Sequence, residues 1–103
     1  MKAPVNGPPP LNISFRTSKI PLQGLVMGIT NTSEIELDGV IVRVHSPGEE
    51  GMRSYVIEAP LVPNDTITVG WVELDGWKLK SGDEVTIECD EYTQPKKVTV
   101  TKP

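Results

Sequence analysis

Most of the chain after residue 10 consists of short runs in which apolar and polar residues alternate. In the first run, single polar residues separate Leu11, Ile13 and Phe15. This period of two residues is typical of a β-strand that buries one face, and no window shows the 3.6-residue period of an amphipathic helix. The other runs are Leu25–Thr30, Val40–His45, Met52–Ala59, Thr66–Trp71, Glu84–Asp90 and Val98–Val100. The pattern predicts an all-β chain of about seven strands.

Turn-forming residues separate these runs, as in Ser46–Gly51 and Asn64–Asp65. Strands joined by short turns pair antiparallel, and no segment could supply the crossover helix that parallel strands require. The run Met52–Ala59 is followed by Pro60 and Pro63, so we expect it to be an edge strand. The sequence therefore predicts a sandwich of two antiparallel sheets.

Length and composition bound the domain organisation. A chain of 103 residues, 37% of them hydrophobic, is long enough for one core and too short for two. Residues 1–10 contain four prolines and one glycine without apolar alternation, which is typical of a linker. We predict a proline-rich linker over residues 1–10 and one sandwich domain over residues 11–103.

Charge and apolar content exclude two kinds of partner. The formal net charge is -4 at pH 7, and the only basic run is Lys96–Lys97. We therefore predict no nucleic-acid binding, which requires a clustered basic surface. No apolar stretch approaches the ~20 residues that span a bilayer, so we expect no direct membrane insertion by this segment. A single cysteine excludes an internal disulfide and leaves the cellular compartment open.

No group of residues points to catalysis. His45, the only histidine, falls on the outward face of its predicted strand. Cys89 shares an apolar face with Val85 and Ile87, which predicts a buried side chain rather than a reactive thiolate. With one histidine and no Gly-x-Ser-x-Gly motif, neither a catalytic nucleophile nor a zinc site has support. We predict a protein that is not an enzyme and uses no cofactor.

The segment Leu79–Cys89 resembles the immunoglobulin signature that leads from the turn before strand F into that strand. The family has a Leu, an Asp, an apolar residue and a Cys at this spacing, and the matching residues are Leu79, Asp83, Val85 and Cys89. Ile87 stands where the family has a Tyr. The resemblance implies an Ig-like sandwich.

A second likeness covers more of the chain. The segment Ile29–Ser33, the valine-rich strand from Val40 and the segment Leu61–Thr66 are similar to bacterial Ig-like accessory domains of the FxLYD type. Those domains occur as modules of envelope proteins and have no known catalysis. The resemblance implies an extracytoplasmic or cell-envelope module with a protein partner or a neighbouring domain.

One outer face is a candidate docking surface. If the runs around Leu25 and Ile67 are neighbours, as strands B and E are in the immunoglobulin topology, Gly28 and Gly70 lie on the same outer face. Two positions without side chains would leave a shallow, weakly polar groove, and glycine inside a strand often marks close approach of another backbone. The proposed docking residues are Val26, Gly28, Thr68, Gly70 and Val72. The occupant would be a second domain or an identical subunit, and the alternative is a bulge or tight bend.

Aromatic residues suggest a different function, the binding of a small ligand. Trp77 sits on a predicted turn, where an exposed ring, helped by Tyr92 on another loop, would stack on a sugar. The alternative is that Trp77 folds back beside Leu79 and covers the core. Trp71 shares the face of its strand with Ile67, so we expect it in the core.

Acidic residues offer a second ligand hypothesis, calcium. Loops at one end of a sandwich would bring some carboxylates together, although the Asp-x-Asp-x-Asp-Gly pattern of a calcium loop is absent. Solvated, solubilising charge is the simpler interpretation. The residues concerned are Glu34, Glu36, Asp38, Glu49, Glu50, Glu73, Asp75, Asp83, Glu84, Glu88, Asp90 and Glu91.

These observations favour a non-enzymatic interaction or spacer module of a larger envelope or surface protein. The alternative is a small ligand-binding module, for carbohydrate through exposed aromatic residues or for calcium through acidic loops. The residues leave the partner, the parent protein and the oligomeric state open.

Overall fold

The computed structural model describes residues 3–19 and 24–102. Residues 1–2, 20–23 and 103, which belong to the predicted linker and domain, lie outside the described residues. The described strands are β1 (Leu11–Thr17), β2 (Leu25–Asn31), β3 (Ile41–His45), β4 (Arg53–Val56), β5 (Thr66–Val69), β6 (Glu84–Glu88) and β7 (Lys96–Thr99). They follow the seven alternating runs, because each strand turns every second side chain toward the core.

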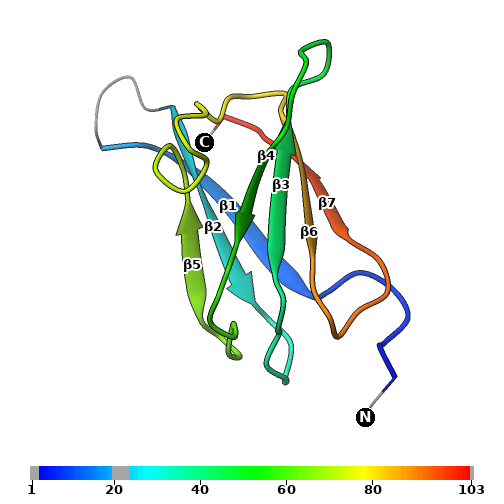
Figure 1. Ribbon diagram of the computed structural model, residues 1–103. Coiled ribbons are helices and arrows are strands. Elements are labelled where there is room, and N and C mark those ends of the chain that lie inside the picture. The colour runs from blue at the N-terminus through cyan, green and yellow to red at the C-terminus, as the bar shows by residue number, and fades with distance from the viewer. Residues whose placement is uncertain (1–2, 20–23, 103) are drawn as a thin grey trace.

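The strands form two antiparallel sheets that pack against each other (Figure 1). One sheet has three strands in the order β1-β2-β5, and the other has four strands in the order β4-β3-β6-β7. Residues 3–19 and 24–102 contain no helix. The prediction of an all-β sandwich of two antiparallel sheets is confirmed, and the run Met52–Ala59 supplies an edge strand as expected.

The core lies between the sheets and is closed at its ends by loop residues. Alternate strand residues are buried, as Val42 and Val44 show in β3. Cys89 continues the alternation of β6 and is 8% exposed, which confirms its predicted burial. Leucines outside the strands are also buried: Leu37, Leu61, Leu74 and Leu79. Strand side chains fill the middle of the sandwich, and these leucines seal the ends from water.

The run predicted over Thr66–Trp71 ends earlier than expected. β5 stops at Val69, and the chain then makes one helical turn in which the Leu74 amide donates to the Gly70 carbonyl at 2.9 Å. Trp71 lies in this turn and is partly exposed, so the prediction of a core tryptophan in a strand is wrong. Leu74 is buried in the core instead, because a helical turn changes which residue faces inward.

Part of the proline-rich start of the chain is attached to the sandwich. The Val5 amide donates to the Glu91 carbonyl at 2.7 Å, and the Thr93 amide donates to the Val5 carbonyl at 3.0 Å. These bonds hold Val5 against the loop between β6 and β7 (Figure 1). That residues 1–10 connect this domain to another one stays a prediction.

Asn31, the last residue of β2, joins segments that are distant in the sequence. Its side chain is fully buried, and its amide nitrogen donates to the carbonyls of Leu61 at 2.8 Å and Ile35 at 2.9 Å. Its amide oxygen accepts from the Ser33 amide at 2.9 Å. The burial is tolerated because the amide is fully paired. Two of the three segments that carry the likeness to Ig-like accessory domains thus lie side by side, and membership of that group stays a prediction.

Candidate functional site

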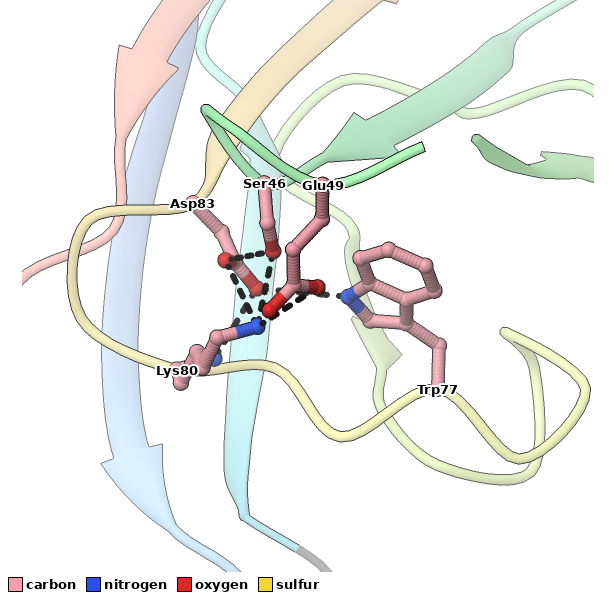
Figure 2. A network of polar contacts seen from close by, with 5 residues as sticks. All are labelled: Ser46, Glu49, Trp77, Lys80 and Asp83. Atoms are coloured by element: carbon pink, nitrogen blue, oxygen red, sulfur yellow. Dashed lines mark hydrogen bonds and ion pairs between the residues drawn. The ribbon is translucent and has the colours of Figure 1, made fainter. Parts of the chain in front are cut away.

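A buried carboxylate, Asp83, organises one end of the sandwich. It directly precedes β6 and is 1% exposed. Its Oδ2 accepts from the Lys80 amide at 3.1 Å and from the indole Nε1 of Trp77 at 3.2 Å, and its Oδ1 accepts from the Ser46 hydroxyl (Figure 2). The interpretation of Asp83 as solvated charge is therefore wrong, because these donors replace the water that a buried carboxylate loses.

Lys80 completes this network from the surface. Its Nζ donates to the Ser46 Oγ at 2.7 Å and lies 3.4 Å from the Oδ1 of Asp83 and 3.6 Å from the Oε2 of Glu49. Ser46 and Glu49 belong to the loop between β3 and β4, so Lys80 ties that loop to the turn before β6 (Figure 2). The Ser46 hydroxyl is a poor candidate nucleophile, since this residue is 3% exposed and a substrate cannot reach it.

Trp77 lies against this network instead of standing open to solvent. It is half-buried and packs against the core, as in the alternative in which it folds back. The guanidinium carbon of Arg53 and the Nζ of Lys80 lie over its ring, each 5.4 Å from the centroid. The ring is therefore already in contact with cations of the protein itself. A cleft of about 330 Å³ beside it is lined by Glu49, Arg53, Gly76, Trp77, Lys78 and Lys80.

The structure does not bring Tyr92 to Trp77. Tyr92 follows β6, whereas Trp77 bonds to Asp83, which precedes β6. The two residues therefore lie beyond opposite ends of that five-residue strand, which is about 17 Å long. Tyr92 is also half-buried and packs against the core. The two residues do not form one stacking platform, and a ligand at either ring alone stays a hypothesis.

The predicted docking residues lie on or next to the outer face of the three-stranded sheet. β2 and β5 are neighbours, and Gly28 faces Thr68 across this pair. Val26 and Gly70 are adjacent at one end, since a Cβ on Gly70 would lie 3.3 Å from the Val26 Cγ2. Val72 follows in the helical turn and is 75% exposed. The structure thus brings Val26, Gly28, Thr68 and Gly70 together along the β2–β5 pair and places Val72 just beyond them.

Neighbouring side chains occupy part of the space that the two glycines were expected to leave as a groove. A Cβ on Gly28 would lie 2.8 Å from the Oγ of Ser14 on β1, and Val26 fills the space beside Gly70. Gly28 lies within an unbroken β2–β5 ladder, whereas Gly70 begins the helical turn. The tight-bend alternative therefore holds for Gly70 and not for Gly28.

The outer faces of the two sheets differ in charge. On the four-stranded sheet, Arg43 pairs with Glu88 at 2.5 Å, and His45 contacts Glu84 at 3.1 Å, so His45 lies on the outward face as predicted. On the three-stranded sheet, Arg16 is the one charged residue at an outward strand position. Those positions hold Asn12, Ser14, Arg16, Val26, Gly28, Thr30, Thr66 and Thr68. Apart from Arg16, this face is uncharged.

Other sequence-based candidates do not assemble into a site. In residues 3–19 and 24–102, no group of three or more His, Cys, Asp or Glu side chains is placed to hold a metal ion. The acidic loops therefore offer no preformed calcium site in the part that the structure describes. Burial raises the pKa of the Cys89 thiol above its ordinary value, which favours the protonated thiol over the nucleophilic thiolate.

Sequence reasoning missed Ser46, Arg53 and Lys80, which surround Trp77 and Asp83. No local pattern marks Ser46, because it and Asp83 are 37 positions apart in the chain. The one available signal was the place of Asp83 in the immunoglobulin-like segment, directly before a strand. That resemblance marked Asp83 itself, and it gave no indication of the residues that donate hydrogen bonds to its carboxylate.

Comparison with known proteins identified no relative of this chain. No protein-family model matches it, and no curated protein or solved structure matches it significantly. Within the described ranges there is no helix of the length and apolarity needed to cross a membrane. Function is therefore inferred from the residues and their geometry.

Proposed function

We propose that this protein is a non-enzymatic interaction or spacer module of a larger envelope or surface protein. The outer face of its three-stranded sheet would meet a protein partner or a neighbouring domain. The observation that carries the proposal is the single charge, Arg16, among the outward strand positions of that face. Charged residues make up 23% of the chain, so an almost uncharged sheet face is an uneven distribution that favours contact with protein over contact with water.

Removing water from this face costs little free energy, because several of its polar groups already have hydrogen-bond partners. Its central strand, β2, is paired on both sides, so its backbone groups are already hydrogen-bonded. The Thr30 and Thr66 hydroxyls bond to each other at 2.7 Å. Burying a polar group is unfavourable mainly when its hydrogen bond is lost. Small side chains around Gly28 also allow another backbone to come close.

The positions of the chain ends suit a module held in series with others. Near the start, Val5 bonds to Glu91, beyond the end of β6. Near the C-terminal end of the described chain, the Val100 amide donates to the carbonyl of Asp83, which directly precedes β6. The described ends therefore leave from opposite ends of a molecule 44 Å long (Figure 1). Domains attached at the two ends would be held apart by about that length.

The envelope location rests on the likeness to Ig-like accessory domains. The strand order supports that likeness, since it pairs the second strand with the fifth and the third with the sixth, as the immunoglobulin topology does. Leu79 and Asp83 also lie in the turn before the sixth strand, where the resemblance places them.

Site-specific photocrosslinking in the intact parent protein tests the docking face. A benzoylphenylalanine is placed at Thr68, on that face, or at Thr99, an exposed residue on the outer face of the other sheet. We expect a defined crosslink to one partner or to the neighbouring domain from position 68 and none from position 99, identified by mass spectrometry. The same products from both positions, or no product from position 68, would reject the docking face.

A charge substitution gives an independent check. Thr68→Lys should reduce crosslinking from a probe at Val72 by at least about tenfold, because the interface would bury an unpaired charge. Thr99→Lys should leave that crosslink unchanged. Circular dichroism of both variants shows whether the sandwich is intact. Equal crosslinking in two folded variants would contradict the proposal.

A further inference from the structure

β4 is an edge strand with an open side. It lies at one margin of the four-stranded sheet, with β3 as its strand neighbour (Figure 1). Just after it, the Ile57 amide donates to the Val40 carbonyl at 2.9 Å. Hydrogen bonding to one neighbour alternates along an antiparallel strand. The odd-numbered residues of β4 therefore bond to β3, and Ser54 and Val56 direct their N–H and C=O groups to the open side.

Between Met52 and Val56, the side chains on the same face as Ser54 are uncharged, and two of them are exposed and apolar. Val56 is 56% exposed, and Met52, which precedes β4, is 53% exposed. By strand alternation both fall on the same face as Ser54. A serine is thus flanked on each side, two residues away, by a large apolar side chain that the monomer leaves in water.

The edge lacks the features that keep many edge strands monomeric. β7, the opposite edge of the same sheet, contains Lys96 and Lys97, and lysines on an edge oppose pairing with another chain. β4 has one charged residue, Arg53, whose guanidinium lies over the Trp77 ring. The segment Ser54–Val56 contains neither a charge nor a proline.

We propose that β4 pairs antiparallel with β4 of a second copy of this chain, around a two-fold axis at Ser54. In this register Ser54 faces Ser54 of the second copy, and Met52 of each copy faces Val56 of the other. Because a two-fold interface uses the same patch on both subunits, each exposed apolar side chain gains an apolar neighbour. The added hydrogen bonds join two four-stranded sheets into one continuous sheet.

The alternation of hydrogen bonds limits which other registers are possible, and the side chains disfavour them. If Ser54 faced Val56 of the second copy, Met52 would face the exposed carboxylate of Glu58. If Val56 faced Val56, Ser54 would face Glu58. In both cases a carboxylate enters the pairing, whereas the register centred on Ser54 pairs Met52 with Val56. The apolar pattern is therefore self-complementary in that register.

A pairing of so few residues buries less than the ~1,600 Å² of a standard interface, so we expect a weak dimer that exchanges rapidly.

Cysteine trapping tests this dimer and its register. In Ser54→Cys, the two thiols would sit on directly facing residues with Cα atoms ~5.5 Å apart, within disulfide range. Val56→Cys is the register control, because its thiols would face Met52. Thr99→Cys, on the same sheet near the opposite edge, measures random collision.

We expect Ser54→Cys to form disulfide-linked dimers at least about tenfold faster than either control, on non-reducing gels under mild oxidation. All three variants keep Cys89, which is buried. Equal rates for Ser54→Cys and Thr99→Cys would overturn the dimer, and faster trapping of Val56→Cys would overturn the register.

A second variant separates loss of pairing from loss of folding. Val56→Lys added to Ser54→Cys should slow disulfide formation to the rate of the Thr99→Cys control, since two lysines would enter the interface. Its circular dichroism should match that of the parent. Unchanged trapping in the folded double variant would overturn the proposal. This edge belongs to a different sheet from the proposed docking face, so either proposal can fail alone.

Discussion

The indole N–H of Trp77 donates to the Oδ2 of Asp83 at 3.2 Å. This bond joins the loop after β5 to the residue before β6, and the Ser46 hydroxyl brings the β3–β4 loop to the same carboxylate. One buried charge therefore holds two connections of the chain together at one end of the sandwich. Removing it would leave donors from both connections without an acceptor.

Replacing Asp83 with Asn should lower the free energy of unfolding by about 2–4 kcal/mol. An amide has one acceptor oxygen in place of two, and its N–H groups would point at other donors. Urea denaturation at pH 7 measures the loss. Asp75→Asn is the matched control, because Asp75 is exposed, and surface changes usually stay within about 0.5 kcal/mol. Similar losses in the two variants would contradict the role given to Asp83.

Gly24→Ala should destabilise the protein much more than Gly48→Ala. Both glycines have positive φ, +76° and +82°, so alanine is strained at either position by about 1 kcal/mol. At Gly24 the new Cβ would also lie 2.7 Å from the carbonyl oxygen of Leu79, whereas nothing lies within 4 Å at Gly48. We expect a total loss of about 3 kcal/mol for Gly24→Ala, because backbone must move. Thermal or urea unfolding compares the two, and equal losses would argue against the contact between Gly24 and Leu79.

The unfolding free energy should fall at alkaline pH because of Cys89. Burial raises the pKa of its thiol above the ordinary value of 9.0, so the folded state holds this proton to a higher pH than the unfolded state does. The contribution is complete below the unfolded pKa and is lost as pH rises through the folded one. Denaturation between pH 8 and 10.5 should therefore show a steeper decline for the native protein than for Cys89→Ala. Parallel curves would show that the thiol does not contribute.

Alternation along the chain was sufficient to locate the strands and most of the core. Leu11–Phe15 and Glu84–Cys89 could be assigned because a strand in one of two packed sheets buries every second residue. This pattern is visible within a few adjacent positions. The same reasoning placed Cys89 inside and His45 outside. It failed at Trp71, since the chain leaves the strand after Val69 and a helical turn carries Leu74 inward.

The environment of the charged and aromatic residues depended on contacts between distant segments. Asp83 resembles the other acidic residues in its local sequence. It is buried because Ser46 of the β3–β4 loop meets Trp77 and Lys80 of the β5–β6 connection at its carboxylate. Likewise, the almost uncharged face exists because β2 pairs with β5, and Thr30 and Thr66, which meet there, are 36 positions apart in the chain. A strand's inward and outward faces follow from its own residues, whereas burial of a charge and the composition of a sheet surface are set by which strands and loops become neighbours.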